Sequence, residues 1–137
     1  MTRLPTFFVP GVPAPQGSKR YVGHRSGKPV LLESSAKVKP WRSVVAQVAL
    51  YKAPQYMDGP VALDIVFILP RPKSLPKRVI HMVKKPDIDK LARSTLDALS
   101  GVAYTDDNQV TDLRTRKRYA SADEPTGANI TIERPTE

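Results

Sequence analysis

The chain has 137 residues, of which 40% are hydrophobic and 26% are charged, and this size and composition are typical of one globular domain spanning residues 1–137. The absence of cysteine excludes disulfides, thiolate-bound zinc and iron–sulfur clusters, and it fits a reducing compartment. With 22 Lys and Arg against 13 Asp and Glu, the formal net charge is +9, which favours a polyanionic partner such as nucleic acid over a merely soluble basic surface.

No segment of the sequence has the pattern of a membrane span or a signal peptide. The longest apolar stretch lies around residues 61–69, far short of the roughly 20 residues that cross a bilayer. The first residues also reach a proline and a glycine before a hydrophobic signal region could form. We therefore expect a cytoplasmic protein that makes no membrane contact.

The first predicted elements are a strand, a long loop and a helix. Residues 4–9 predict a short strand, and the Pro- and Gly-rich stretch after it predicts an irregular loop. Long loops are often functional, and Lys19 and Arg20 make this one a candidate DNA contact. Apolar residues then recur at helical spacing, which indicates an amphipathic helix over 40–52 with Trp41 packed into the core.

The middle of the chain combines a buried strand with a basic loop. Strict apolar alternation over 61–69 predicts a strand, in which Asp64 is a solvated or edge residue rather than a metal ligand. The proline-broken stretch 70–86 predicts a connecting loop. Its candidate DNA contacts are Arg71, Lys73, Lys84 and Lys85.

The last part of the chain predicts a second helix over 88–100, with a glycine at its end, and two further strands over 109–119 and 129–133. The resulting order is βαβαββ in one α/β (α+β) domain. Alternate residues of a strand share a face, so the arginines of the first of these strands form one basic row. This row, a further candidate DNA contact, consists of Arg114, Arg116 and Arg118.

Two acidic pairs bracket the second helix. Asp87 and Asp89 stand at its start, and Asp106 and Asp107 follow its end. The helix is about 18 Å long, and the residues after it cover about 20 Å if they are extended, so the second pair can return beside the first. Helix capping explains one aspartate at a helix start, but it explains the second pair less well.

Converging carboxylates repel one another unless a cation neutralises them, and oxygen ligands suit Mg²⁺, with Mn²⁺ as a substitute. A basic surface would attract the DNA backbone, while the acidic pocket would hold metal for phosphodiester hydrolysis. This combination favours a metal-dependent nuclease. The alternative is a noncatalytic basic nucleic-acid-binding module in which the aspartates only cap helices.

Residues 84–110 resemble the signature segment of the RusA family of Holliday junction resolvases. They contain Lys-Lys-Pro-Asp-Ile-Asp-Lys-Leu, then Leu-Asp-Ala-Leu, then Asp-Asp-Asn-Gln-Val. The resemblance implies a homodimeric endodeoxyribonuclease with a mixed sheet flanked by two helices, which cuts four-way DNA junctions symmetrically in recombination and repair with Mg²⁺. The occurrence of the family suggests a phage or prophage gene. A metal nuclease for flaps or other branched DNA is a further alternative.

The resemblance also assigns roles to individual residues. The catalytic, metal-binding aspartates of the family fall on Asp87, Asp89 and Asp107, with Asp106 as an accessory metal ligand. The catalytic lysine of the family is replaced by Arg93, which keeps the charge and suits a phosphate clamp but not a proton donor.

A second departure from the family pattern is Lys90, which stands where the family usually has Asn. Lys90 adds a positive charge, and its ammonium group can stand in for that of the family lysine, which Arg93 replaces. We therefore assign both Lys90 and Arg93 to the catalytic group. Asp97 lies four residues after Arg93, a spacing that predicts a surface ion pair. The sequence therefore places Asp97 outside the site.

Overall fold

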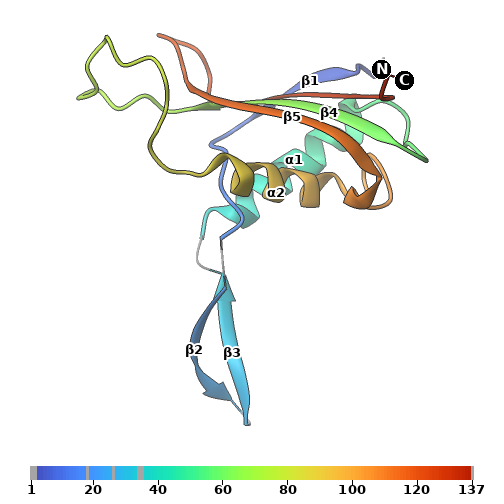
Figure 1. The fold of residues 1–137 in the computed structure, drawn as a ribbon, viewed down its shortest axis with the longest axis horizontal. Helices are drawn as coiled ribbons and strands as arrows, with labels where there is room; N and C mark the ends of the chain where they lie inside the picture. Colours follow the sequence, from blue (N-terminus) through green and yellow to red (C-terminus); the bar gives the residue numbers. More distant parts are fainter. Residues whose placement is uncertain (1–2, 18, 26, 34–35, 137) are drawn as a thin grey trace.

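A computed structural model describes residues 3–17, 19–25, 27–33 and 36–136 (Figure 1). The elements of the described chain follow in the order β1 (Thr6–Pro10), β2 (Lys19–Arg25), β3 (Lys28–Glu33), α1 (Val38–Lys52), β4 (Val61–Leu69), α2 (Ile88–Leu99), the 3₁₀ helix η1 (Asp107–Gln109), β5 (Val110–Tyr119) and β6 (Gly127–Glu133). All the predicted helices and strands are present, with ends shifted by at most two residues. Neither described helix is long and apolar enough to cross a membrane.

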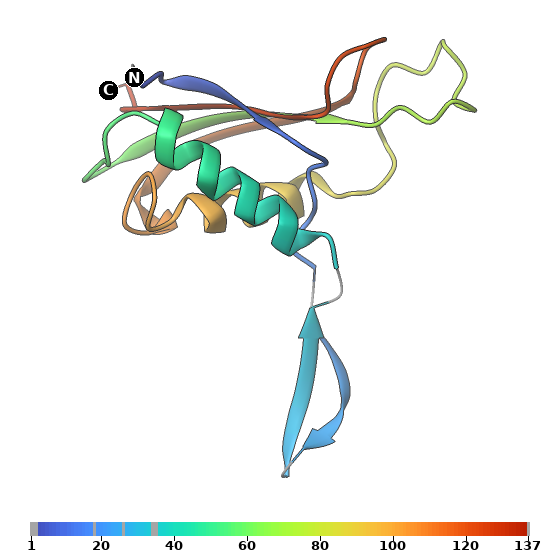
Figure 2. The same ribbon diagram turned by 180° about the vertical axis from the view of Figure 1, so that it is seen from behind.

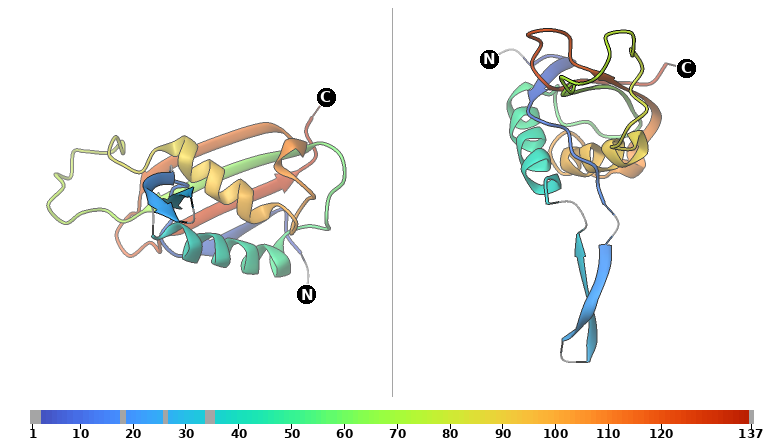
Figure 3. Two further views of the ribbon diagram at one scale, coloured as in Figure 1. Left: turned by 90° about the horizontal axis from the view of Figure 1, so that it is seen from below. Right: turned by 90° about the vertical axis from the view of Figure 1, so that its left-hand side faces the viewer.

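The main sheet has the strand order β1–β6–β4–β5. Strands β4 and β5 are parallel, because α2 and its flanking loops provide the long crossover that parallel neighbours require. The other two pairs are antiparallel. Both helices cover the same face of the sheet, as Figure 1 shows from the side and Figure 3 from below. The structure thus confirms the α+β class and the mixed sheet with its two helices.

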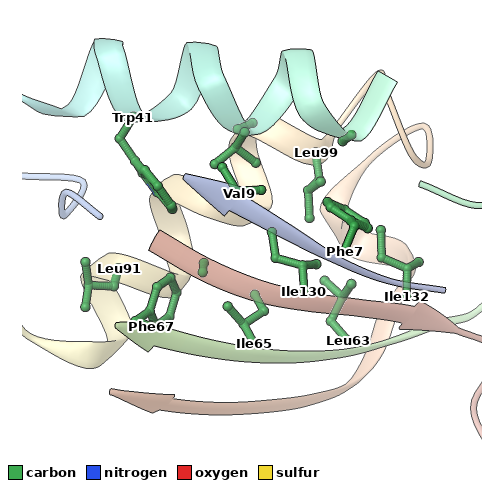
Figure 4. Close-up of a cluster of buried hydrophobic side chains, with 14 of the residues drawn as sticks. Phe7, Val9, Trp41, Leu63, Ile65, Phe67, Leu91, Leu99, Ile130 and Ile132 are labelled. Carbon is green, nitrogen blue, oxygen red and sulfur yellow. The ribbon is translucent and has the colours of Figure 1, made fainter. Parts of the chain in front are cut away.

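The core lies between the helices and one face of β4. Buried residues alternate along this strand and include Val61, Leu63, Ile65 and Phe67. Figure 4 shows several of these side chains packed between the sheet and the helices. Trp41 is buried in the same cluster, and its Nε1 donates a hydrogen bond to Thr95 Oγ1 at 3.2 Å. It joins α1 to α2, which confirms its role as a packing residue.

The stretch that was predicted to be an irregular loop contains the β2–β3 hairpin, so the predicted element order is wrong here. Arg25 pairs with Lys28 across a two-residue turn, and Gly27 has a φ of 76°, a left-handed conformation that tight hairpin turns favour. The Ser-Gly dipeptide at this turn is the signal that could have identified it. The observed order is βββαβαββ rather than βαβαββ.

The hairpin projects away from the body of the protein (Figure 2). It forms a two-stranded sheet of its own. The segment leading into it is fixed to α2, because Gln16 N–H donates to Lys90 O at 2.9 Å and Ser94 Oγ donates to Ala14 O at 2.6 Å. The side chains of Lys19 and Arg20 lie outside the described part of the structure.

Candidate functional site

The first acidic pair is exposed at the start of α2. Asp87 occupies the N-cap position with an extended backbone, but its side chain makes no capping hydrogen bond. Its Oδ2 lies 3.7 Å from Nζ of Lys90. Asp89 is exposed in the first turn of the helix, where the helix dipole favours negative charge. The carboxylate of Asp87 therefore does not cap the helix, and its partner within the chain is the ammonium group of Lys90.

The second acidic pair is held in place by Gln109. The Oε1 atom of Gln109 accepts hydrogen bonds from the backbone N–H groups of Thr105 at 2.8 Å and Asp106 at 3.0 Å. Its Nε2 atom donates to the carbonyl oxygens of Met57 at 3.0 Å and Gly59 at 2.9 Å. One side chain thus ties the aspartate turn to the segment before β4. Gln109 is a positioning residue that the sequence analysis did not single out.

Asp107 lies close enough to Asp97 for its negative charge to affect the pKa of that carboxyl. Burial raises the pKa of the Asp97 carboxyl; Arg42 lowers it, and the negative charge of Asp107 raises it further. Burial also raises the pKa of Tyr104, and Asp107 adds to that rise as well. The predicted surface ion pair between Asp97 and Arg93 is not found among the described residues. Asp97 instead accompanies the second acidic pair.

The structure does not bring the two acidic pairs together within one chain. The expected extended return after α2 is replaced by a compact turn, in which the backbone N–H of Gly101 donates to Tyr104 O at 2.7 Å and the N–H of Ala103 donates to Leu99 O at 2.9 Å. The second pair consequently stays near the end of α2, about one helix length of 18 Å from the first. Among the described residues, no three Asp, Glu or His side chains are grouped closely enough to hold a metal.

The basic row on β5 lies on the sheet face opposite the helices. The strand register pairs Arg114 with Asp64, whose neighbours in β4 are buried on the other face. Arg116 forms an ion pair with Asp64 at 3.3 Å. Because β4 lies between β6 and β5, Asp64 belongs to a central strand and is not an edge residue. Arg118 donates two hydrogen bonds to Glu124, at 2.7 and 2.8 Å. These bonds are the largest cause of the lowered pKa of Glu124, about 2.

The predicted basic loop of residues 70–86 contains no helix or strand and extends beyond the sheet (Figure 1). Arg71 is half-buried and fixes the loop, because its guanidinium donates to Val79 O and Pro76 O and lies 5.5 Å from the ring centre of Tyr119. The other candidate DNA contacts of this loop are exposed: Lys73, Lys84 and Lys85. The last two are separated from the first acidic pair by Pro86 alone.

Comparison with known proteins identifies the family. A family model described as endodeoxyribonuclease RusA matches residues 10–133. The chain belongs to the RusA endodeoxyribonuclease family. The uncharacterized protein YqaN of Bacillus subtilis (strain 168) is 35% identical over 125 residues, which cover 83% of this chain and 87% of that protein. The family assignment from the sequence is confirmed, and membership in the RusA family makes the chain a nuclease.

RusA nucleases act on branched DNA junctions and generally depend on a divalent metal. The residues of this chain suit such a metal. Asp87 and Asp89 offer exposed carboxylates at a helix start, and oxygen donors are the ligands that Mg²⁺ and Mn²⁺ prefer. The capping alternative does not account for Asp87, whose side chain makes no capping hydrogen bond, whereas Asp106 forms a capping box with Gln109 at the start of η1.

Proposed function

We propose that the chain is a Mg²⁺-dependent endonuclease that resolves four-way DNA junctions by paired, symmetric phosphodiester hydrolysis in recombination and repair. The observation that carries the proposal is the exposed carboxylate of Asp87, which stands at a helix start without capping it. The family membership supports the reaction class. The net charge of +9 supports attraction of the DNA backbone.

The metal ligands are Asp87, Asp89 and Asp107, with Asp106 as an accessory ligand. A bound Mg²⁺, or Mn²⁺ in its place, supplies charge stabilisation at phosphorus and a lowered pKa for the attacking water. The acidic side chains hold it. Lys90 and Arg93, on the first two turns of α2, contribute positive charge toward the scissile phosphate.

A homodimer reconciles this ligand set with the separation of the two pairs. Each copy has one acidic pair at the start of α2 and the other near its end. If a two-fold axis relates two copies so that their α2 helices run antiparallel, the start of one helix lies beside the end of the other. Asp107 of the partner subunit then completes the site begun by Asp87 and Asp89. Asp89 and Arg93 are exposed on α2, so this side of the helix is open to a second copy.

DNA contacts are proposed for the two basic segments that flank the start of α2. The β2–β3 hairpin leaves the body beside Lys90, to whose carbonyl Gln16 is hydrogen-bonded. The loop of residues 70–86 leads directly into Asp87. A two-stranded ribbon is narrow enough to enter a DNA groove. Together the hairpin and the loop would hold the arms of a branched substrate on either side of the acidic pair.

Replacement of Arg93 tests its role as a phosphate clamp. We expect Arg93→Ala to lose far more turnover than Arg93→Lys, because lysine retains a positive charge although it loses the forked geometry. Arg78→Ala, which removes an exposed arginine from the basic loop, controls for charge loss alone. Single-turnover cleavage of a junction measures the effect. Equal rates for Arg93→Ala, Arg93→Lys and the wild type would remove Arg93 from the site.

The proposed function is tested with labelled synthetic substrates. We expect the purified protein to make paired cuts in a four-way junction with Mg²⁺, to cut the matching linear duplex far less, and to cut neither with EDTA. Binding of the junction without any cleavage would favour the noncatalytic module. Faster cleavage of a flap than of the four-way junction would assign the enzyme to another branched substrate.

A further inference from the structure

Lys117 differs from its basic neighbours on β5 in the direction of its side chain. The strand register pairs it with Phe67, which is buried on the helix-covered face of β4. Arg116 and Arg118 occupy alternate positions on the opposite face. Lys117 is half-buried on this face, and removing part of a charge from water is costly unless the charged group is hydrogen-bonded.

The partners of Lys117 are two backbone carbonyls immediately before the first acidic pair. Its Nζ donates to Lys84 O at 2.8 Å and to Pro86 O at 2.9 Å. Hydrogen bonds from an ammonium group are stronger than those between neutral groups. They tie the end of the loop of residues 70–86, which has no helix or strand, to a strand of the central sheet. The chain therefore enters Asp87 from a fixed position.

We infer that Lys117 is a positioning residue that fixes the backbone before Asp87 and thereby preorganises the first acidic pair for metal binding. The inference rests on the proposed function for its catalytic consequence, but the structural contact exists without it. Groups that orient metal ligands without touching the metal typically change affinity or activity by about 10- to 100-fold when they are removed. A lysine that instead contacted DNA phosphate would affect mainly DNA affinity.

The test compares Lys117→Met with Lys117→Arg and with Lys77→Met, which removes an exposed lysine of the same loop. We expect Lys117→Met to raise the Mg²⁺ concentration for half-maximal junction cleavage by about tenfold. Its junction affinity in EDTA should fall no more than that of Lys77→Met. Arginine keeps the charge and the donors, so Lys117→Arg should recover part of the Mg²⁺ response.

Hydrogen exchange separates this inference from the proposed function. The backbone N–H of Leu91, which donates to Asp87 O at 3.1 Å, should exchange at least several-fold faster in Lys117→Met than in Lys77→Met, whether or not the protein cleaves DNA. If Lys117→Met does not fold, we expect Lys117→Arg to show a smaller increase in the rate of amide hydrogen exchange. An unchanged exchange rate and an unchanged Mg²⁺ midpoint would overturn the inference. A wild-type protein without metal-dependent cleavage would instead refute the proposed function and leave the exchange result to decide the role of Lys117.

Discussion

Replacement of Asp87, Asp89 or Asp107 with asparagine is expected to abolish junction cleavage while leaving junction binding intact or stronger. Each change removes a metal ligand but removes no positive charge, so the attraction for the DNA backbone persists. Loss of several kcal/mol of charge stabilisation corresponds to about 10³-fold in rate, since about 1.4 kcal/mol is one factor of ten. Single-turnover cleavage with Mg²⁺ and binding with EDTA measure the two effects separately.

Asp112→Asn is a matched control, because Asp112 is exposed on β5 and lies outside the proposed ligand set. It should cleave at nearly the wild-type rate. If Asp106 is an accessory ligand, Asp106→Asn should cleave at a rate between that of the three ligand variants and that of Asp112→Asn. Cleavage at nearly the wild-type rate by any of the three ligand variants would exclude that residue from the site.

The elements that cover the core could be predicted because burial imposes a period on their residues. Strand β4 has the same ends in the sequence prediction as in the structure, since every second residue over Val61–Leu69 must be apolar to face the helices. The β2–β3 hairpin forms a separate sheet. The sequence of this hairpin carries no comparable alternation, and its glycines and proline resemble those of a loop.

The identities of the candidate ligands could be predicted, but their positions could not. The sequence shows the two acidic pairs, Asp87 with Asp89 and the later Asp-Asp pair. The residues between the end of the helix and the second pair are numerous enough to let the two pairs meet. The compact turn after α2 is closed by short-range hydrogen bonds, such as that from the N–H of Gly101 to Tyr104 O. The aspartate segment after this turn is anchored by hydrogen bonds to distant residues, from Gln109 to Met57 and Gly59. The contacts of Lys117 with the loop before Asp87 are equally nonlocal, spanning more than 30 residues.

The separation of the two pairs within one chain requires an active site shared between two subunits if all three aspartates bind one metal site. If each site takes Asp89 from one copy and Asp107 of the partner subunit, then two inactive variants can restore one another. A dimer of one Asp89→Asn chain and one Asp107→Asn chain has one site with both defects and one site with neither. After statistical mixing, about a quarter of all sites should be intact.

Subunit mixing is therefore the most direct measurement. Asp89→Asn and Asp107→Asn proteins are unfolded and refolded together, light scattering confirms the dimer, and cleavage of a doubly labelled junction is measured. We predict that each variant alone is inactive and that the mixture recovers about a quarter of the wild-type incisions, mostly as single nicks. A mixture of Asp87→Asn with Asp89→Asn should recover none, because every site then lacks a ligand. A mixture of Asp89→Asn with Asp107→Asn that stays as inactive as its components would contradict the shared site.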